Sequence, residues 1–154
     1  MQTSIRRAGA LALCALGVLI GASIARTDDK AGTIAAGKLA KHPEEYYGKT
    51  VSVRAEVEDV FGSNMFTLDE DALFAGPDVL VLVPKGLSAT LMHDQKVTVT
   101  GRVRRYVEAE LKKDYDWFDH GKLVNVKHKV EWETRPVVVA ASIRTEDGRE
   151  LLSE

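Results

Sequence analysis

The densest group of residues with the chemistry to bind a metal ion lies in the segment 113–122, KDYDWFDHGK. It contains Asp114, Asp116, Asp119 and His120. Carboxylates and an imidazole can hold a divalent cation, but their spacing matches neither an EF-hand loop nor a His-x-x-x-His pair. His128 follows eight residues later, whereas a zinc site needs three or four ligands in a closed arrangement. We therefore predict no metal and no other cofactor, and we expect the aspartates to lie on a solvated helix end.

A second group combines arginines with aromatic side chains, as in proteins that bind single-stranded nucleic acid along a basic groove. Glutamates such as Glu56 and Glu108 are interleaved with these arginines. Ion pairs on a solvated sheet face explain this pattern more simply than a phosphate-binding groove does. We do not expect a nucleic acid partner, and we predict that another, unidentified ligand is bound. Its predicted binding residues are Arg54, Arg102, Arg104, Tyr106, Trp117 and Trp132.

Patterns for covalent catalysis are missing from the sequence. It has no Gly-x-Ser-x-Gly motif and no glycine-rich phosphate loop. Its one cysteine, Cys14, lies in an apolar run near the N-terminus. We therefore predict that the protein is not an enzyme.

The first 25 residues have the pattern of an export signal. Arg6 and Arg7 precede an uncharged run, AGALALCALGVLIGASIA, at residues 8–25. A positive segment, an apolar segment and a small-x-small end describe a cleaved signal peptide, here with Ser23-Ile24-Ala25 at the cleavage site. An uncleaved anchor that holds the protein to the membrane through residues 8–25 is the alternative, since a transmembrane helix needs about 20 residues. Either way, we expect the domain in the periplasm or on the outer face of the cytoplasmic membrane.

Charge and cysteine content limit what the exported part can do. The whole chain has 21 basic and 23 acidic residues, and removal of the two arginines in 1–25 leaves 19 basic residues and a net charge of −4. That charge argues against a general surface for nucleic acid or anionic lipid. With no cysteine after residue 25, the domain has no disulfide and must depend on its hydrophobic core.

The elements that must position the candidate residues are mostly short strands. Apolar and polar residues alternate over 51–57, and the alternation slips after Val57, which indicates a β-bulge. A second alternation runs over 97–103, where Gly101 indicates a bend or a close backbone approach. Further strands are expected at 65–68, 79–83 and 137–143.

The run Val79–Val83 is purely aliphatic and predicts a strand buried on both faces. Leu80 and Leu82 would share one face, and the three valines the other. We expect one face to fill the barrel interior and the other to lie under a helix or under the insertion 107–134.

The remaining segments predict helices and connectors. Thr33 is a candidate N-cap of a short helix that contains Leu39, and Pro43–Gly48 has the composition of one helical turn. The apolar spacing of 107–118 predicts an amphipathic helix, and 124–132 alternates like a strand or extended arm. We expect 86–93 to be a connector with at most a short helix.

Five short strands with a bulged first strand fit a small closed barrel of the OB type. The fold class is thus mainly β: a five-stranded OB-type barrel with an N-terminal helix, an amphipathic helix and an extended insertion before the last strand. We expect a linker at 26–32, an OB-fold-like domain at 33–144 and a polar tail at 145–154.

Five segments resemble small exported bacterial OB-fold proteins, including those grouped with tRNA-anticodon-binding-like domains. The resemblance covers about residues 38–143 and implies the OB fold, and the group's name would imply RNA. The matching segments are Tyr46-Tyr47-Gly48-Lys49-Thr50-Val51, Asp59-Val60, Phe66-Thr67-Leu68, Val97-Thr98-Val99-Thr100-Gly101-Arg102-Val103 and Arg135-Pro136-Val137-Val138-Val139-Ala140.

These observations predict a non-enzymatic binding or interaction module, exported or anchored to the membrane. Its partner would be an envelope protein or a small ligand, bound in a groove across the first three strands and walled by the insertion 107–134. The alternative is an OB-fold protein that binds nucleic acid through the Arg102–Tyr106 face or a metal through the segment 114–128.

Overall fold

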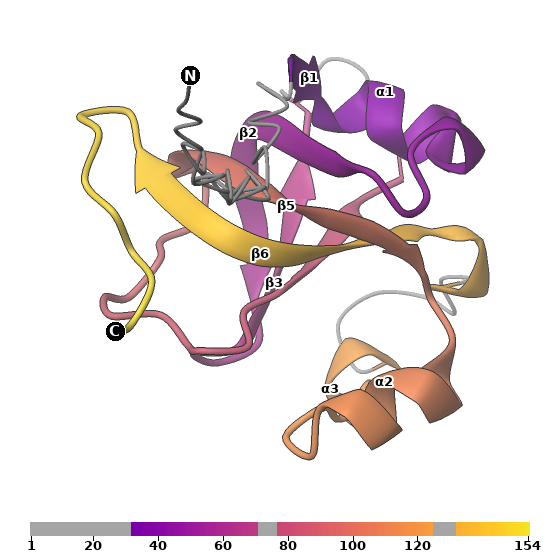
Figure 1. The fold of residues 1–154 in the computed structure, drawn as a ribbon. Coiled ribbons are helices and arrows are strands. Elements are labelled where there is room, and N and C mark those ends of the chain that lie inside the picture. The colour runs from indigo at the N-terminus through magenta and orange to yellow at the C-terminus, as the bar shows by residue number, and fades with distance from the viewer. Residues whose placement is uncertain (1–31, 71–76, 125–131) are drawn as a thin grey trace, which may run out of the picture.

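The computed structural model describes residues 32–70, 77–124 and 132–154. Five strands form a closed barrel, in the order β2-β3-β4-β6-β5 with β5 pairing back to β2 (Figure 1). Neighbouring strands are antiparallel, except that β4 and β6 run parallel. The predicted OB-type barrel is confirmed. The strands are β2 (Thr50–Val60), β3 (Met65–Asp69), β4 (Val79–Leu82), β5 (Lys96–Arg105) and β6 (Pro136–Thr145).

Alternation of side chains produces the barrel interior. Val51, Val53 and Val57 of β2 are buried and belong to the hydrophobic core inside the barrel. The pairing of β2 with β3 shifts between Val57 and Val60, so the predicted bulge is present. The bulge lies just after Glu56, which is the last residue of β2 that pairs with β5. From Glu56 to Val60, β2 pairs with β3.

The strand β4 is buried on both faces, as predicted, and it separates two hydrophobic cores. Val79, Val81 and Val83 lie in the core inside the barrel. Leu80 and Leu82 lie in a second core outside the barrel wall, under the insertion between β5 and β6. The other buried members of this second core are Met65, Tyr106, Leu111, Phe118, Leu123, Trp132 and Val137.

The insertion folds into short helices instead of one helix and an arm. Two α-helices, α2 (Glu108–Asp114) and α3 (His120–Val124), lie close together outside the barrel (Figure 1). The predicted helix through Phe118 is wrong, because the backbone at Tyr115 is extended. Residues 125–131 of the expected arm lie outside the described residues, and its end is a 3-10 helix, η2 (Trp132–Thr134).

The N-terminal segment also differs from the prediction. Thr33 does not cap a helix: it begins a short strand, β1 (Thr33–Ala35), which pairs in parallel with β2. Backbone pairing of β1 with Ser52–Arg54 of β2 replaces the expected side-chain cap at Thr33. The helix α1 (Ala36–Lys41) begins three residues later and places Leu39 in the barrel core. A 3-10 helix, η1 (Pro43–Glu45), forms the expected helical turn.

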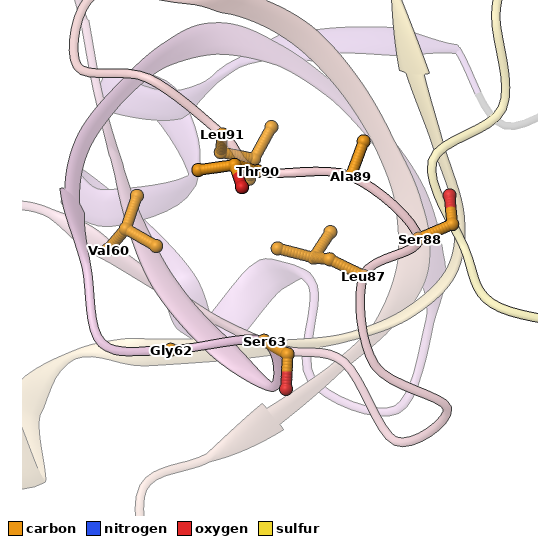
Figure 2. A pocket seen from close by; sticks show the side chains of 8 residues that line it. All are labelled: Val60, Gly62, Ser63, Leu87, Ser88, Ala89, Thr90 and Leu91. Atoms are coloured by element: carbon orange, nitrogen blue, oxygen red, sulfur yellow. The ribbon is translucent and has the colours of Figure 1, made fainter.

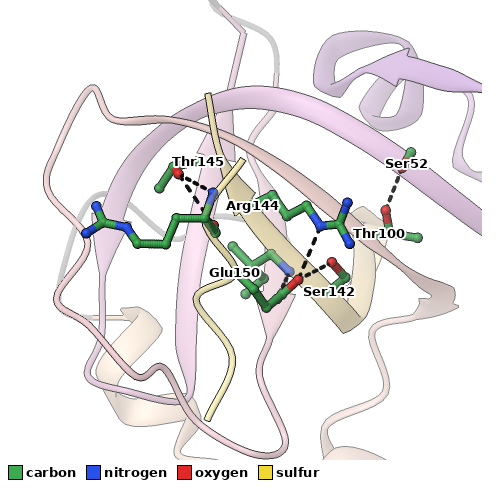
Figure 3. Close-up of polar contacts among 8 residues, drawn as sticks. Ser52, Thr100, Ser142, Arg144, Thr145 and Glu150 are labelled. Atoms are coloured by element: carbon green, nitrogen blue, oxygen red, sulfur yellow. Dashed lines mark hydrogen bonds and ion pairs between the residues drawn. The ribbon is translucent and has the colours of Figure 1, made fainter. Parts of the chain in front are cut away.

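The segment 145–154, predicted as a polar tail, packs on the barrel. Leu151 is buried in the barrel core. The Glu150 carboxylate accepts hydrogen bonds from the backbone N–H of Ile143 (2.8 Å) and from the hydroxyl of Ser142 (2.6 Å) (Figure 3). Leu152 forms a β-bridge with Leu87 of the connector, which contains no helix.

The predicted export signal and most of the linker fall outside the described residues, which begin at residue 32. Among the residues that are described, no helix has the length and apolar content needed to cross a membrane.

Candidate functional site

The six predicted binding residues do not form one surface. Arg54 and Arg102 are exposed on the outside of the barrel, on β2 and β5. Tyr106 and Trp132 are core residues of the insertion, with only 4% and 5% of their surface exposed. Trp117 is half-buried against Tyr115, with ring centroids 5.2 Å apart.

Tyr106 is held in the second core by its neighbours and is not available to stack on a ligand. Its ring packs against Phe118 and Trp132, at centroid distances of 6.1 and 6.4 Å. Its hydroxyl lies 2.5 Å from Nδ1 of His120. Burial raises the pKa of Tyr106, and the nearby charges of Glu108 and Glu133 raise it further, so the phenol stays protonated.

The predicted groove across the first three barrel strands is not open. Nucleic acid-binding OB folds use the outer face of their second and third strands, which correspond here to β3 and β4. On that face, Met65, Leu80 and Leu82 are buried in the second core. The insertion covers this face instead of walling a groove beside it, because its own apolar side chains require a surface to pack on.

The acidic segment 114–120 is used for internal contacts. Asp114 binds Arg104, with 2.8 Å between Oδ2 and Nη1, and Asp119 accepts a hydrogen bond from the backbone N–H of Gly121. His120 contacts Tyr106 and lies 3.9 Å from a carboxylate oxygen of Glu108. Within the described part of the chain, no three histidine, aspartate or glutamate residues are placed to hold a metal ion. His128 lies outside that part.

Two of the predicted residues do come together, in a pocket of about 320 Å³ outside the barrel wall. Its lining consists of Arg102 and Arg104 from β5, Val139 from β6, and Tyr115, which follows α2. Arg102 is opposite Val139 in the β5–β6 register. Arg102 and Arg104 lie two residues apart on one strand and so point to the same face.

The two arginines of this pocket differ in their pairing. The guanidinium of Arg104 binds Asp114 at 2.8 Å and Glu110 at 3.2 Å, and its side chain is 25% exposed. Burial acts to lower the pKa of Arg104, but the hydrogen bonds and charges of Asp114 and Glu110 raise it overall. The Arg102 side chain makes no hydrogen bond or ion pair with any residue that the structure describes. The Arg102 guanidinium is therefore free to bind a ligand.

A second pocket, of about 380 Å³, has a different chemistry. It lies between the turn after β2 and the connector after β4 (Figure 2). No charged side chain lines it, and the exposed Met92 follows its last lining residue in sequence. Its lining residues are Val60, Gly62, Ser63, Leu87, Ser88, Ala89, Thr90 and Leu91.

Sequence reasoning found the arginines of the first pocket but missed Tyr115 and Val139. Tyr115 falls within the segment 107–118, whose spacing predicts one helix; in the structure it follows α2 in extended backbone and lines the pocket with Arg102. Val139 has the pattern of any valine in a strand. Its place beside Arg102 depends on the β5–β6 register, for which no local signal exists.

No protein-family model matches this sequence, and no curated protein matches it. The resemblance to exported OB-fold proteins therefore stays a prediction from the residues that carry it.

Proposed function

We propose that this protein is an exported, non-enzymatic binding module that uses the outside of an OB-type barrel. The support for export is Arg6-Arg7 followed by the uncharged run 8–25. The support for binding without catalysis is a site built from two arginines, a tyrosine and a valine, in a sequence with no Gly-x-Ser-x-Gly motif and no glycine-rich phosphate loop.

The observation that carries the proposal is the second core. Leu80 and Leu82 are packed under the insertion, and this cover on the β3–β4 face argues against its use as a nucleic acid platform. We therefore assign binding to a surface outside that face, the pocket in which the Arg102 guanidinium is unpaired.

The arrangement of the other basic residues argues against nucleic acid as the partner. Arg54 pairs with Glu146 at 2.8 Å, and Arg144 pairs with Glu150 at 3.4 Å. Arg105 lies over the ring of Tyr47 at 4.4 Å. A groove for single strands needs several unpaired cations in a row with exposed aromatic rings, and Tyr106 is buried.

Cell fractionation and oligonucleotide titration test the proposal. In spheroplasts, added protease should digest the protein, and mass spectrometry should find either residue 26 as the N-terminus or the whole chain in the membrane fraction. Fluorescence anisotropy should show no saturable binding of oligo-dT or oligo-U at physiological salt. A protease-protected, cytosolic, full-length chain would refute export, and tight oligonucleotide binding would refute the assigned partner class.

Affinity capture from native envelope fractions tests the binding role. The folded chain should retain a specific envelope protein or small molecule that a heat-unfolded sample of the same chain does not. Equal recovery on both samples would count against a specific binding module.

A further inference from the structure

We propose that the pocket of Arg102, Arg104, Tyr115 and Val139 binds a small organic monocarboxylate with a flat apolar body. This inference rests on the proposed function as a binding module and names the ligand class of its site. It is carried by an unpaired guanidinium beside an aromatic ring and an aliphatic side chain.

The unpaired guanidinium of Arg102 selects an anion, and the acids near the pocket favour a singly charged one. Arg104 carries one positive charge and its partners Asp114 and Glu110 carry two negative charges, so the guanidinium donors left for a ligand are those of Arg102. The same two acids lie on the α2 side of the pocket and repel a dianion more strongly than a monoanion. The planar guanidinium can donate two parallel hydrogen bonds to a carboxylate.

The pairing of Arg104 gives the site a fixed wall. Its guanidinium donates through Nη1 to Asp114 at 2.8 Å and through Nη2 to Glu110 at 3.2 Å, and these two contacts hold it in one orientation. Arg102, two residues earlier on the same strand, has no such anchor and can turn to meet a ligand. The ligand would thus meet one ordered side chain and one adaptable one.

The other walls select an apolar body of limited size. Tyr115 packs against Trp117 at 5.2 Å with 33° between the ring planes, which fixes the Tyr115 ring beside the pocket. Val139 supplies aliphatic surface next to Arg102. A volume of about 320 Å³ is at the small end of ligand sites and suits a one-ring molecule.

The test uses three probes on the full chain in detergent: benzoate, its neutral isostere benzamide, and inorganic phosphate. Amide chemical shifts in ¹⁵N–¹H spectra should move saturably with benzoate at residues of β5, β6 and the Tyr115 region. Benzamide and phosphate should bind at least about tenfold more weakly, since one lacks the charge and the other the apolar body. Equal shifts with benzoate and benzamide would overturn the role of Arg102, and equal shifts with benzoate and phosphate would overturn the role of the apolar walls.

Matched arginine variants localise the site. Arg102→Gln should weaken benzoate binding at least about tenfold, whereas Arg144→Gln should leave it unchanged because Arg144 is paired with Glu150 and does not line the pocket. Equal weakening by both variants would mean non-specific attraction to the sheet face, and no saturation in the unmodified chain would mean no site. If benzoate does not bind but the protein is exported and captures a specific envelope partner, only the proposed ligand class is overturned.

Discussion

Gly101 of β5 and Val139 of β6 approach each other more closely than any other residue type at position 101 would allow. A Cβ on Gly101 would lie 2.3 Å from the carbonyl oxygen of Val139. The β5–β6 pairing shifts register at this point, between Thr100 and Gly101. The close approach and the shift together bend the two strands around the barrel, and they place Val139 beside Arg102.

Gly101→Ala should therefore destabilise the protein by about 1–3 kcal/mol, because backbone has to move to relieve the overlap. Gly32→Ala is the matched control, since a Cβ at Gly32 meets nothing within 4 Å. Denaturant titrations followed by circular dichroism measure both variants. A midpoint for Gly101→Ala equal to that for Gly32→Ala would contradict the close approach.

Leu82→Ala should cost about 2–5 kcal/mol, because Leu82 is fully buried in the second core and its removal leaves a cavity. Lys112→Ala, at an exposed α2 position paired with Glu108, should change stability by less than about 1 kcal/mol. Unfolding midpoints in urea test this difference. Similar small shifts for both variants would mean that the insertion does not pack on β4.

The contacts of Glu150 with β6 should make the attachment of the C-terminal segment weaker at acidic pH. Burial acts to raise its pKa, but hydrogen bonds from Ser142, Ile143, Leu152 and Arg144 lower it overall, below its ordinary value of 4.5. A carboxyl whose pKa is lowered by folding adds stability above its unfolded pKa, and this stability is lost as the pH falls through the folded pKa.

Glu150→Gln should accordingly be less stable than the unmodified chain at pH 7, and the difference should shrink below about pH 4.5. Hydrogen exchange at the Ile143 amide, which donates to Glu150, should be faster in the variant at neutral pH. A stability difference that does not change between pH 7 and pH 3 would argue against this role of the carboxylate.

For Asp69 we expect the opposite dependence of stability on pH. Burial, together with the charges of Glu58, Glu70 and Glu56, raises its pKa above the ordinary value of 3.8, although a hydrogen bond from the Glu70 backbone N–H opposes the rise. An ionised carboxylate is then unfavourable at neutral pH, and stability rises as the pH falls through the raised pKa.

Asp69→Asn should therefore be more stable than the unmodified chain at pH 7, because the amide oxygen can still accept from Glu70 and the charge is gone. The advantage should vanish at acidic pH, where Asp69 is protonated. Thermal unfolding at pH 7 and pH 3.5 measures it. A lower midpoint for the variant at pH 7 would show that the carboxylate is stabilising.

The strands of the barrel can be predicted from local patterns in the sequence. Alternating valines fix which side of each strand faces inward, the phase slip after Val57 locates a bulge, and Gly101 marks a close approach. The run Val79–Val83 also predicted both of its environments, because an aliphatic strand with no polar face needs cover on both sides. Each of these features depends on residues only a few positions apart, so the periodicity of a strand is enough to predict it.

The tertiary structure alone decided which surface is open. Thr33 and the C-terminal segment join the barrel by pairing with residues distant in sequence, so their composition does not predict this packing. Tyr106 and Trp132, aromatic residues beside charged ones, have the composition of a ligand platform, but the fold of the insertion buries them. Arg102 remains unpaired because the neighbouring acids Glu110 and Asp114 bind Arg104. Pairing between charges from separate elements depends on how those elements pack, and no sequence spacing specifies that.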